Sequence, residues 1–252
     1  MHLELIVLFF IIAAVYASAG FGGGSSYLAV MTLFGLGMEA VRPTSLLCNI
    51  VVVTAGAWIF WKNGFLNLRK IRSLCLASIP MAFFGGYTPL KEKTFFILLG
   101  VCLVVSAALV VFQRSGTPVE AAPADPPPTW PSWLPPALGA GIGYLSGLVG
   151  IGGGIFLAPI LHLLRWDAPK NIAATASFFI LVNSVFGLAG QLWKGGIHLD
   201  VSLTIPLLLS VFLGGQVGSR LNVLVFTQSQ VRWITALLVL YAAVNILWKH
   251  LW

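Results

Sequence analysis

The chain has 252 residues, of which 58% are hydrophobic and only 8% are charged, and its mean hydropathy is +0.96. This composition excludes a soluble globular protein, in which about a quarter of the residues are charged. The net charge of +7 does not indicate nucleic-acid binding, because the basic residues are spread over loops without a dense run. We therefore expect a polytopic membrane protein that lies in a lipid bilayer and binds no nucleic acid.

The apolar runs predict helices and not the strands of a barrel. Runs such as 95–112 and 231–248 are long enough to cross a bilayer and do not alternate between polar and apolar residues. The fold class we expect is all-α. The expected helical segments are 3–19, 25–37, 43–61, 71–90 and 94–113 in the first half, and 134–149, 155–166, 171–193, 201–221 and 231–249 in the second half.

Two glycine clusters occupy matching places, one at residues 20–24 (GFGGG) and one at 150–154 (GIGGG). Glycine breaks a helix and allows another group to approach the backbone closely. A helix that starts after the break directs unpaired N–H groups and its positive dipole end at the break, which favours an anion. A helix-packing surface of small residues is the alternative interpretation, which two matching clusters make less attractive.

A Pro-rich stretch separates the two halves. Residues 124–128 read ADPPP, a sequence that neither forms a helix nor packs a core. We expect a first transmembrane repeat at 1–113, a cytoplasmic linker at 114–133 and a second transmembrane repeat at 134–252.

Four sequence markers recur in the same order in both halves, which predicts two homologous repeats. They are Gly22–Gly24 with Gly152–Gly154, Thr44-Ser45 with Thr175 to Ser177, the WK-containing turns at 61–64 and 193–196, and the Gly-Gly pairs at 85–86 and 214–215. Each repeat has four to five helical segments, with the glycine clusters in broken or re-entrant helices. Five crossings in each half would make the repeats inverted, four would make them parallel, and we favour inversion.

The basic residues predict the orientation. With five crossings per half, nine of these residues share one side and five the other. The side with nine holds Lys62, Arg69, Lys70, Arg72, Arg114, Arg165, Lys170, Arg220 and Arg232, and the side with five holds Arg42, Lys91, Lys93, Lys194 and Lys249. The positive-inside rule then puts residues 62–72 and the linker in the cytoplasm and both termini outside.

Polar residues beside the glycine clusters complete the candidate site, because hydroxyl and amide groups bind an oxyanion without adding a full charge. The predicted substrate-binding residues are Gly22, Gly23, Gly24, Ser25, Ser26, Thr44, Ser45, Asn49, Gly152, Gly153, Gly154, Thr175, Ser177 and Asn183. For any polar residue taken alone, a hydrogen bond between helices or back to its own helix is the competing interpretation. No Arg or Lys lies in the middle of an expected segment, so we expect the two helix dipoles to offset the anion's charge without a basic side chain.

The duplicated glycine clusters, the Thr-Ser elements, the tryptophan turns and the Gly-Gly pairs together resemble the TauE/SafE family of sulfite exporters. The resemblance covers both halves apart from the linker. It implies a secondary transporter that exports small sulfur-containing anions, such as sulfite or organosulfonates, across the cell inner (cytoplasmic) membrane. The chain departs from the pattern at Pro43, which precedes Thr44, and at Ala176, which lies between Thr175 and Ser177. The particular anion, the coupling ion and an oligomeric state stay open.

Two other classes of function have sequence features of their own. An enzyme is not expected, because the sequence has no His-Glu-x-x-His motif and no pair of intramembrane aspartates, and we expect no catalytic residue, metal or cofactor. An anion channel, or an importer of a related small oxyanion, is the alternative function, since glycine-rich loops also line pores.

Overall fold

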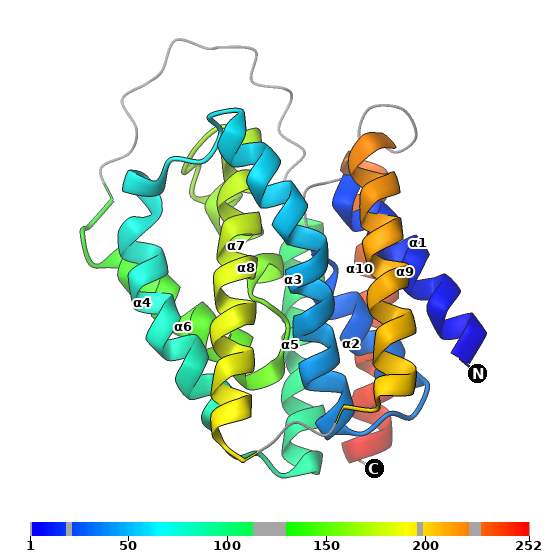
Figure 1. The fold of residues 1–252 in the computed structure, drawn as a ribbon. Coiled ribbons are helices and arrows are strands. Elements are labelled where there is room, and N and C mark those ends of the chain that lie inside the picture. The colour runs from blue at the N-terminus through cyan, green and yellow to red at the C-terminus, as the bar shows by residue number, and fades with distance from the viewer. Residues whose placement is uncertain (1, 19–21, 113–129, 196–198, 222–227, 252) are drawn as a thin grey trace.

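The computed structural model describes residues 2–18, 22–112, 130–195, 199–221 and 228–251 (Figure 1). Within these ranges the regular structure is helical and contains no strand, which confirms the all-α prediction. Most of the expected linker, and residues 20 and 21 of the first glycine cluster, fall outside the described ranges. The helices are α1 (His2–Ser18), α2 (Gly24–Leu33), α3 (Met38–Lys62), α4 (Leu68–Tyr87), α5 (Glu92–Phe112), α6 (Leu134–Val149), α7 (Gly154–Leu163), α8 (Pro169–Trp193), α9 (Val201–Leu221) and α10 (Gln228–Leu251).

Four of these helices have the length and composition of a membrane span in the described part of the chain. They are Met38–Lys62, Glu92–Val111, Pro169–Trp193 and Val201–Gly218. By contrast, α2 and α7 have ten residues each, which at 1.5 Å per residue is about 15 Å, half of a typical hydrocarbon core. The short segments that the sequence predicts after the glycine clusters are therefore present, and neither can cross a bilayer alone.

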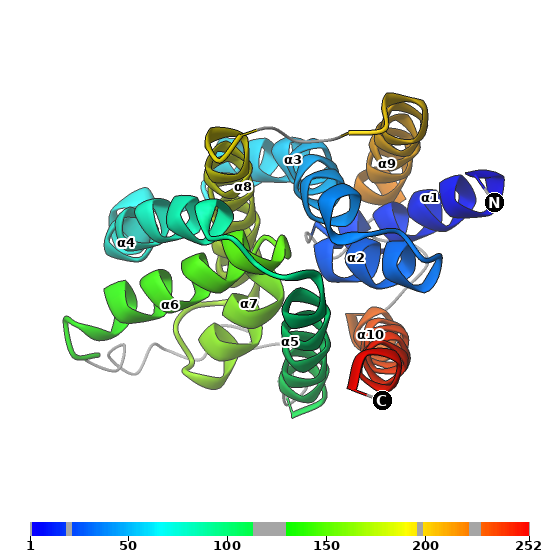
Figure 2. The same cartoon turned by 90° about the horizontal axis from the view of Figure 1, so that it is seen from below.

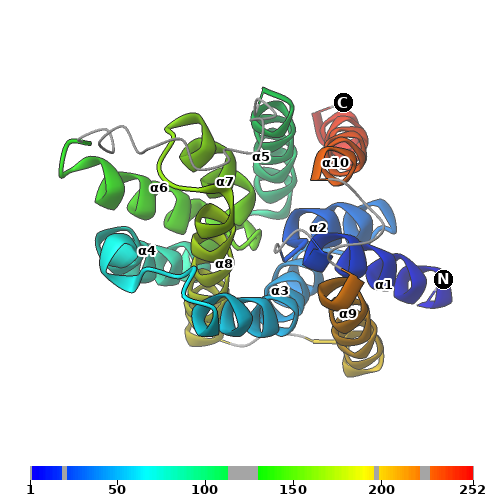
Figure 3. The same ribbon diagram turned by 90° about the horizontal axis from the view of Figure 1, so that it is seen from above.

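Helices from the two halves of the sequence pack against each other in pairs. α3 lies against α8 in the middle of the molecule, α4 against α6 at one side, α1 against α9 at the opposite side, and α5 against α10. Figures 2 and 3 show this arrangement from below and from above. Each of these pairs joins one half to the other, so the halves interlock.

The α4–α6 pair depends on the absence of side chains at one stripe of α6. A Cβ added at Gly139 or Gly147 would collide with a backbone carbonyl of α4, and one added at Gly143 would lie 2.7 Å from Ser78 O. The same holds on the other side, where a Cβ at Gly214 or Gly218 of α9 would collide with backbone of α1. Small residues at such crossings let two membrane helices approach closely.

The long central helices run in opposite directions. In Figure 1, α3 begins at the lower end of the molecule and finishes at the upper end, whereas α8 begins at the upper end and finishes at the lower end. Both have 25 residues. The first residue of α2, Gly24, lies beside Asn49 in the middle of α3, and the first residue of α7, Gly154, lies beside Ile180 in the middle of α8. Both short helices therefore start in the interior.

Candidate functional site

The two glycine clusters cap the short helices. Gly23 is the N-cap of α2 and Gly153 is the N-cap of α7, and both have a left-handed backbone with φ of +81°. Only glycine adopts this conformation without strain, which is why the chain carries it at both turns. Neither helix start is capped by a side chain. The first N–H groups of α2 and α7 are thus left for another acceptor, as the sequence predicts.

Asn49 of α3 brings the two clusters together. Its side chain is fully buried, and Nδ2 donates a hydrogen bond to the Ile151 carbonyl of the second cluster at 3.1 Å. A Cβ added at Gly22 would lie 2.7 Å from Asn49 Oδ1, and one added at Gly152 would lie 2.6 Å from Nδ2. A Cβ at Gly24 would collide with both Nδ2 and the Ile151 carbonyl. The amide is therefore enclosed by glycine backbone from both halves of the chain.

The hydroxyl groups predicted for the site are all buried. Ser45 of α3 donates to the Gly24 carbonyl at 3.1 Å, and Ser26 shares a hydrogen bond with the Tyr16 hydroxyl at 2.6 Å. The others form a set of buried side chains: Ser25, Thr44, Thr175 and Ser177. Ser45 links two helices at the first cluster, so the structure brings it to the site together with the glycines.

Asn183, also predicted for the site, forms a hydrogen bond back to its own helix, which was the alternative interpretation for these polar residues. Its Nδ2 donates to the Phe179 carbonyl, one turn back in α8, at 2.7 Å. Its Oδ1 is buried and has no hydrogen-bond partner. Asn183 is therefore held by its own helix and does not bridge the clusters as Asn49 does.

Several buried polar atoms without a partner surround the clusters. Among the described residues, these include Tyr27 Oη, Asn49 Oδ1, Ser146 Oγ and Ser184 Oγ. A Cβ added at Gly23 would lie 3.2 Å from the Tyr27 oxygen, and one at Gly152 would lie 3.1 Å from the Ser184 oxygen. Buried polar groups are nearly always paired in folded proteins, so this concentration indicates a place where a polar ligand or water completes the bonding.

Sequence reasoning missed Tyr27, Ser146 and Ser184. Each follows a signal that was present: Tyr27 and Ser146 lie close in sequence to the two clusters, and Ser184 is adjacent to Asn183. Their contribution depends on which way the helices face, and the apolar runs carry no clear periodicity that would show it.

The expected helix at 43–61 places Arg42 in the loop before it, and this placement is wrong. Arg42 belongs to α3, and its side chain is only 5% exposed. Its Nη2 donates to the Gly86 carbonyl at 3.5 Å and to the Gly147 carbonyl at 3.3 Å. Pro43 made a helix start at residue 43 plausible, which placed Arg42 in a loop. In the structure α3 begins at Met38 and Pro43 lies in its second turn.

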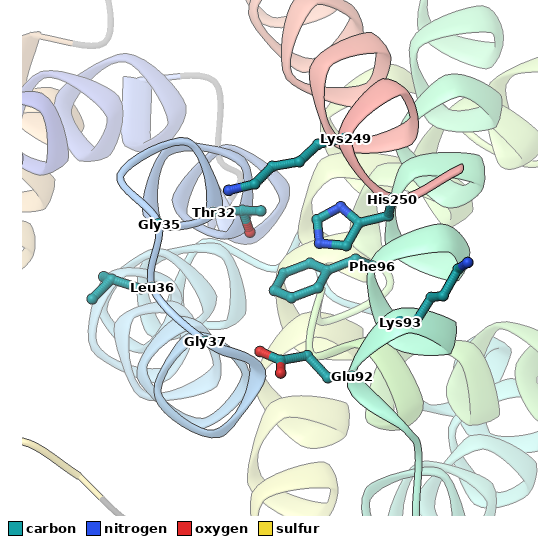
Figure 4. A pocket seen from close by; sticks show the side chains of 9 residues that line it. All are labelled: Thr32, Gly35, Leu36, Gly37, Glu92, Lys93, Phe96, Lys249 and His250. Carbon is teal, nitrogen blue, oxygen red and sulfur yellow. The ribbon is translucent and has the colours of Figure 1, made fainter. Parts of the chain in front are cut away.

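A separate pocket of about 510 Å³ opens at the lower end of the molecule (Figure 4). Its lining comes from the α2–α3 connection, the start of α5 and the end of α10. Figure 4 shows the Lys249 amino group and the Glu92 carboxylate on opposite sides of this pocket, with His250 and Phe96 between them. The rings of His250 and Phe96 are stacked, with centroids 4.4 Å apart. None of the predicted site residues lines it.

An ion pair joins α4 to the α7–α8 connection at the upper end. Lys70 Nζ lies 2.7 Å from Asp167 Oδ2 and also donates to the Trp166 carbonyl. Partial burial would raise the pKa of Asp167. Hydrogen bonds from Lys70, Asn171 and the Ala168 backbone, together with the Lys70 charge, outweigh burial and hold this pKa below its usual value. Asp167 is thus a structural anion.

Four span-length apolar helices, together with two short helices that start at a shared buried site, define a polytopic membrane transporter. The chain belongs to the TauE/SafE sulfite exporter family, whose model matches residues 5–246. The resemblance seen in the glycine clusters is thereby confirmed, and membership places the chain among membrane transporters and not among enzymes.

Similar proteins are named as membrane transporters. The chain is 32% identical to probable membrane transporter protein y4hK of Sinorhizobium fredii (strain NBRC 101917 / NGR234), over 97% of each chain. It is 24% identical to probable membrane transporter protein YunE of Bacillus subtilis (strain 168), over 86% of this chain and 87% of that protein. It is 26% identical to probable membrane transporter protein MamO of Magnetospirillum gryphiswaldense, over 79% of this chain and 38% of that protein. No solved structure matches the chain significantly.

Proposed function

We propose that this protein is a secondary transporter that exports sulfite or small organosulfonates across the cytoplasmic membrane. The proposed anion site lies where the N-termini of α2 and α7 meet around Asn49. The observation that carries the proposal is the pair of uncapped helix starts beside a buried amide, in a family named for sulfite export.

The chemistry of the site suits a small oxyanion. Two helix N-termini contribute N–H groups and partial positive charge, which stabilise an anion. Sulfite and sulfonate groups present several acceptor oxygens to such donors. The Tyr27 and Ser184 hydroxyl groups lack partners and can also donate hydrogen bonds. The partial charges of the two helix N-termini offset only part of the anion's charge, so the anion can also be released.

Two inverted repeats would explain the interlocked fold. The proposal is supported by the opposite directions of α3 and α8 and by the equal lengths of α3 with α8 and of α2 with α7. Inverted repeats that share a central site are typical of transporters working by alternating access. In this proposal the repeats are residues 1–113 and 134–252, joined by a cytoplasmic linker.

The two repeats would contribute different side chains to the site, although their helices are related by approximate symmetry. A Cβ added at Gly24 collides with Asn49, whereas one added at the corresponding Gly154 collides with the Ile180 side chain. A polar amide in α3 therefore has an apolar counterpart in α8. We assign the principal polar contact with the anion to the first repeat.

Sulfite flux into proteoliposomes of the purified protein tests the proposed function. Asn49→Asp places a carboxylate of the same shape beside the cradle, and like-charge repulsion in a buried site should reduce flux by at least about tenfold. The matched control is Asn63→Asp, an exposed asparagine at the end of the same helix, which should transport normally. Wild-type protein that carries neither sulfite nor any organosulfonate would refute the proposal. Flux that an imposed ion gradient cannot drive uphill would indicate a channel.

A further inference from the structure

We infer that Arg42 is the charge-selecting residue of this transporter: its guanidinium binds the anion between the lower end of the molecule and the glycine site. The inference rests on the proposed function and adds to it a full positive charge. Selectivity for anions would then come from one side chain and not from helix dipoles alone.

The charge of Arg42 is buried without being neutralised. Among the described residues, the one ion pair is Lys70 with Asp167, so no carboxylate is paired with Arg42. Its two hydrogen bonds, at 3.3 and 3.5 Å, are longer than strong N–H···O bonds, and its buried Nε has no partner. A charge in a membrane-spanning segment is costly when it is left this way, and such residues usually mark a substrate pathway.

The groups around Arg42 hold a cation in place but leave its charge available. Gly86 and Gly147 lie in the last turns of α4 and α6, whose C-terminal ends carry partial negative charge. The guanidinium also lies over the Phe95 ring, 6.0 Å from its centroid. Partial charges and a ring face orient a guanidinium without satisfying it, so an oxyanion at Nε would complete its bonding.

Arg42 shares a helix face with the residues that contact the glycine clusters. Ser45 donates to the Gly24 carbonyl and Asn49 donates to the Ile151 carbonyl. With spacings of three and seven residues from Arg42, both lie on its side of α3. A Cβ added at Gly150 would lie 3.2 Å from Arg42 Cα. The second glycine segment therefore runs along α3 from Arg42 towards Asn49, a distance of about 10 Å along the helix.

The pocket at the lower end is separated from Arg42 by two phenylalanine rings. Phe96 lines this pocket, and its ring contacts the Phe95 ring with centroids 5.1 Å apart. Phe95 in turn lies beneath the guanidinium. The Lys249 amino group, seen in Figure 4, adds positive charge at the pocket itself. An anion that leaves the glycine site towards the lower end would pass Arg42 behind the two aromatic rings and then Lys93 and Lys249 at the pocket.

The second half lacks an equivalent charge. When Met38 of α3 is matched with Pro169 of α8, the first residues of two helices of equal length, Arg42 corresponds to Ala173. The cation is therefore confined to one end of the proposed pathway. The two access states would differ in charge as well as in geometry.

Arg42→Gln and Arg42→Lys, each reconstituted as the full chain, test the inference. We expect Arg42→Gln to raise the KM for sulfite at least tenfold and to abolish the rise in melting temperature that sulfite causes in the wild type. Its melting temperature without sulfite should equal or exceed that of the wild type, because an unpaired buried charge is removed. Arg42→Lys should keep part of the affinity. Lys194→Gln, which removes an exposed charge at the same end, should change neither value.

A purely structural role would give the opposite pattern. If Arg42 only holds α4 and α6, Arg42→Gln lowers the melting temperature without sulfite and leaves KM unchanged, which overturns the inference. Wild-type sulfite flux together with unchanged KM in Arg42→Gln also overturns it and leaves the proposed function standing. Absence of sulfite and organosulfonate flux in the wild type refutes the proposed function, and this inference with it.

Discussion

Three glycines from two distant parts of the chain surround the Asn49 amide, each at a point where a Cβ would meet the amide within 2.7 Å or collide with it. At the residue scale, the site thus depends on the absence of side chains at these glycines as much as on the Asn49 side chain. Gly23 and Gly153 add a second requirement, since their left-handed backbone disfavours any residue with a side chain. Space and backbone conformation together explain why both clusters consist of glycine.

Alanine at the two caps should therefore damage the site through strain. Gly23→Ala and Gly153→Ala each place a Cβ on a backbone with φ of +81°, and in Gly153→Ala it lies 2.9 Å from Phe179. We expect each to lose about 1–2 kcal/mol of stability and most of its sulfite transport. Gly56→Ala in α3 is the matched control: its Cβ meets no atom within 4 Å, so it should gain up to about 1 kcal/mol. Normal transport by both cap variants, despite strained caps, would contradict a backbone cradle.

The sequence predicted which residues are glycine-rich and polar, but not which of them meet. Asn49 was identified from its place in an apolar run, while Tyr27 and Ser184 were not. Arg42 was misplaced because a proline one residue later suggested a loop. Whether a side chain is buried depends on the partner helix that covers it, and in Arg42 the covering groups come from α4 and α6. Local sequence does not contain that information.

At the scale of elements, helix existence was predictable and helix boundaries were less so. The apolar runs and glycine breaks located all ten helices that the described residues form, because membrane-spanning segments must satisfy their backbone internally. The start of α3 lies five residues before the predicted one, and α4 both begins and ends three residues earlier than predicted. These ends are set by contacts outside the apolar runs. The Lys70–Asp167 ion pair is one such contact, since it ties the first turn of α4 to the segment before α8.

The Lys70–Asp167 contact should make stability depend on pH. Because the pKa of Asp167 is lower in the folded protein, its stabilising effect is present above the usual aspartate pKa and is lost as pH falls through the lower folded value. Asp167→Asn should therefore lower the melting temperature in detergent at pH 7, because it removes a partly exposed ion pair that contributes about 1 kcal/mol to stability. Below about pH 4 the same substitution should lower the melting temperature much less. Glu39→Gln, at an exposed carboxylate in the first turn of α3, is the control. An equal loss at both pH values would argue against the ionised pair.

At the scale of the whole molecule, the paired helices divide the surface into two ends with different charge. Residues 62–72 lie at the upper end in Figure 1, while the starts of α3 and α5 lie at the lower end. The loop count of basic residues was nine against five, and removing the buried Arg42 from the smaller group leaves four (five minus one). The corrected position of Arg42 therefore widens the margin in favour of a cytoplasmic upper end.

The ends of α3 and α8 provide a matched pair for testing both inversion and orientation. Asn63 follows α3 and Lys194 follows α8, at corresponding places in the two halves, and both residues are exposed. In inverted repeats they lie on opposite faces of the membrane; in parallel repeats they share one face. On a background in which the buried Cys48, Cys75 and Cys102 are replaced, we expect an impermeant thiol reagent added outside intact cells to label Lys194→Cys and not Asn63→Cys. Permeabilised cells, in which both variants should react, provide the control for reactivity. Labelling of both variants from outside would rule out inversion. Labelling of Asn63→Cys alone would agree with inversion but reverse the orientation, so that the end of the pathway near Arg42 would face the cytoplasm.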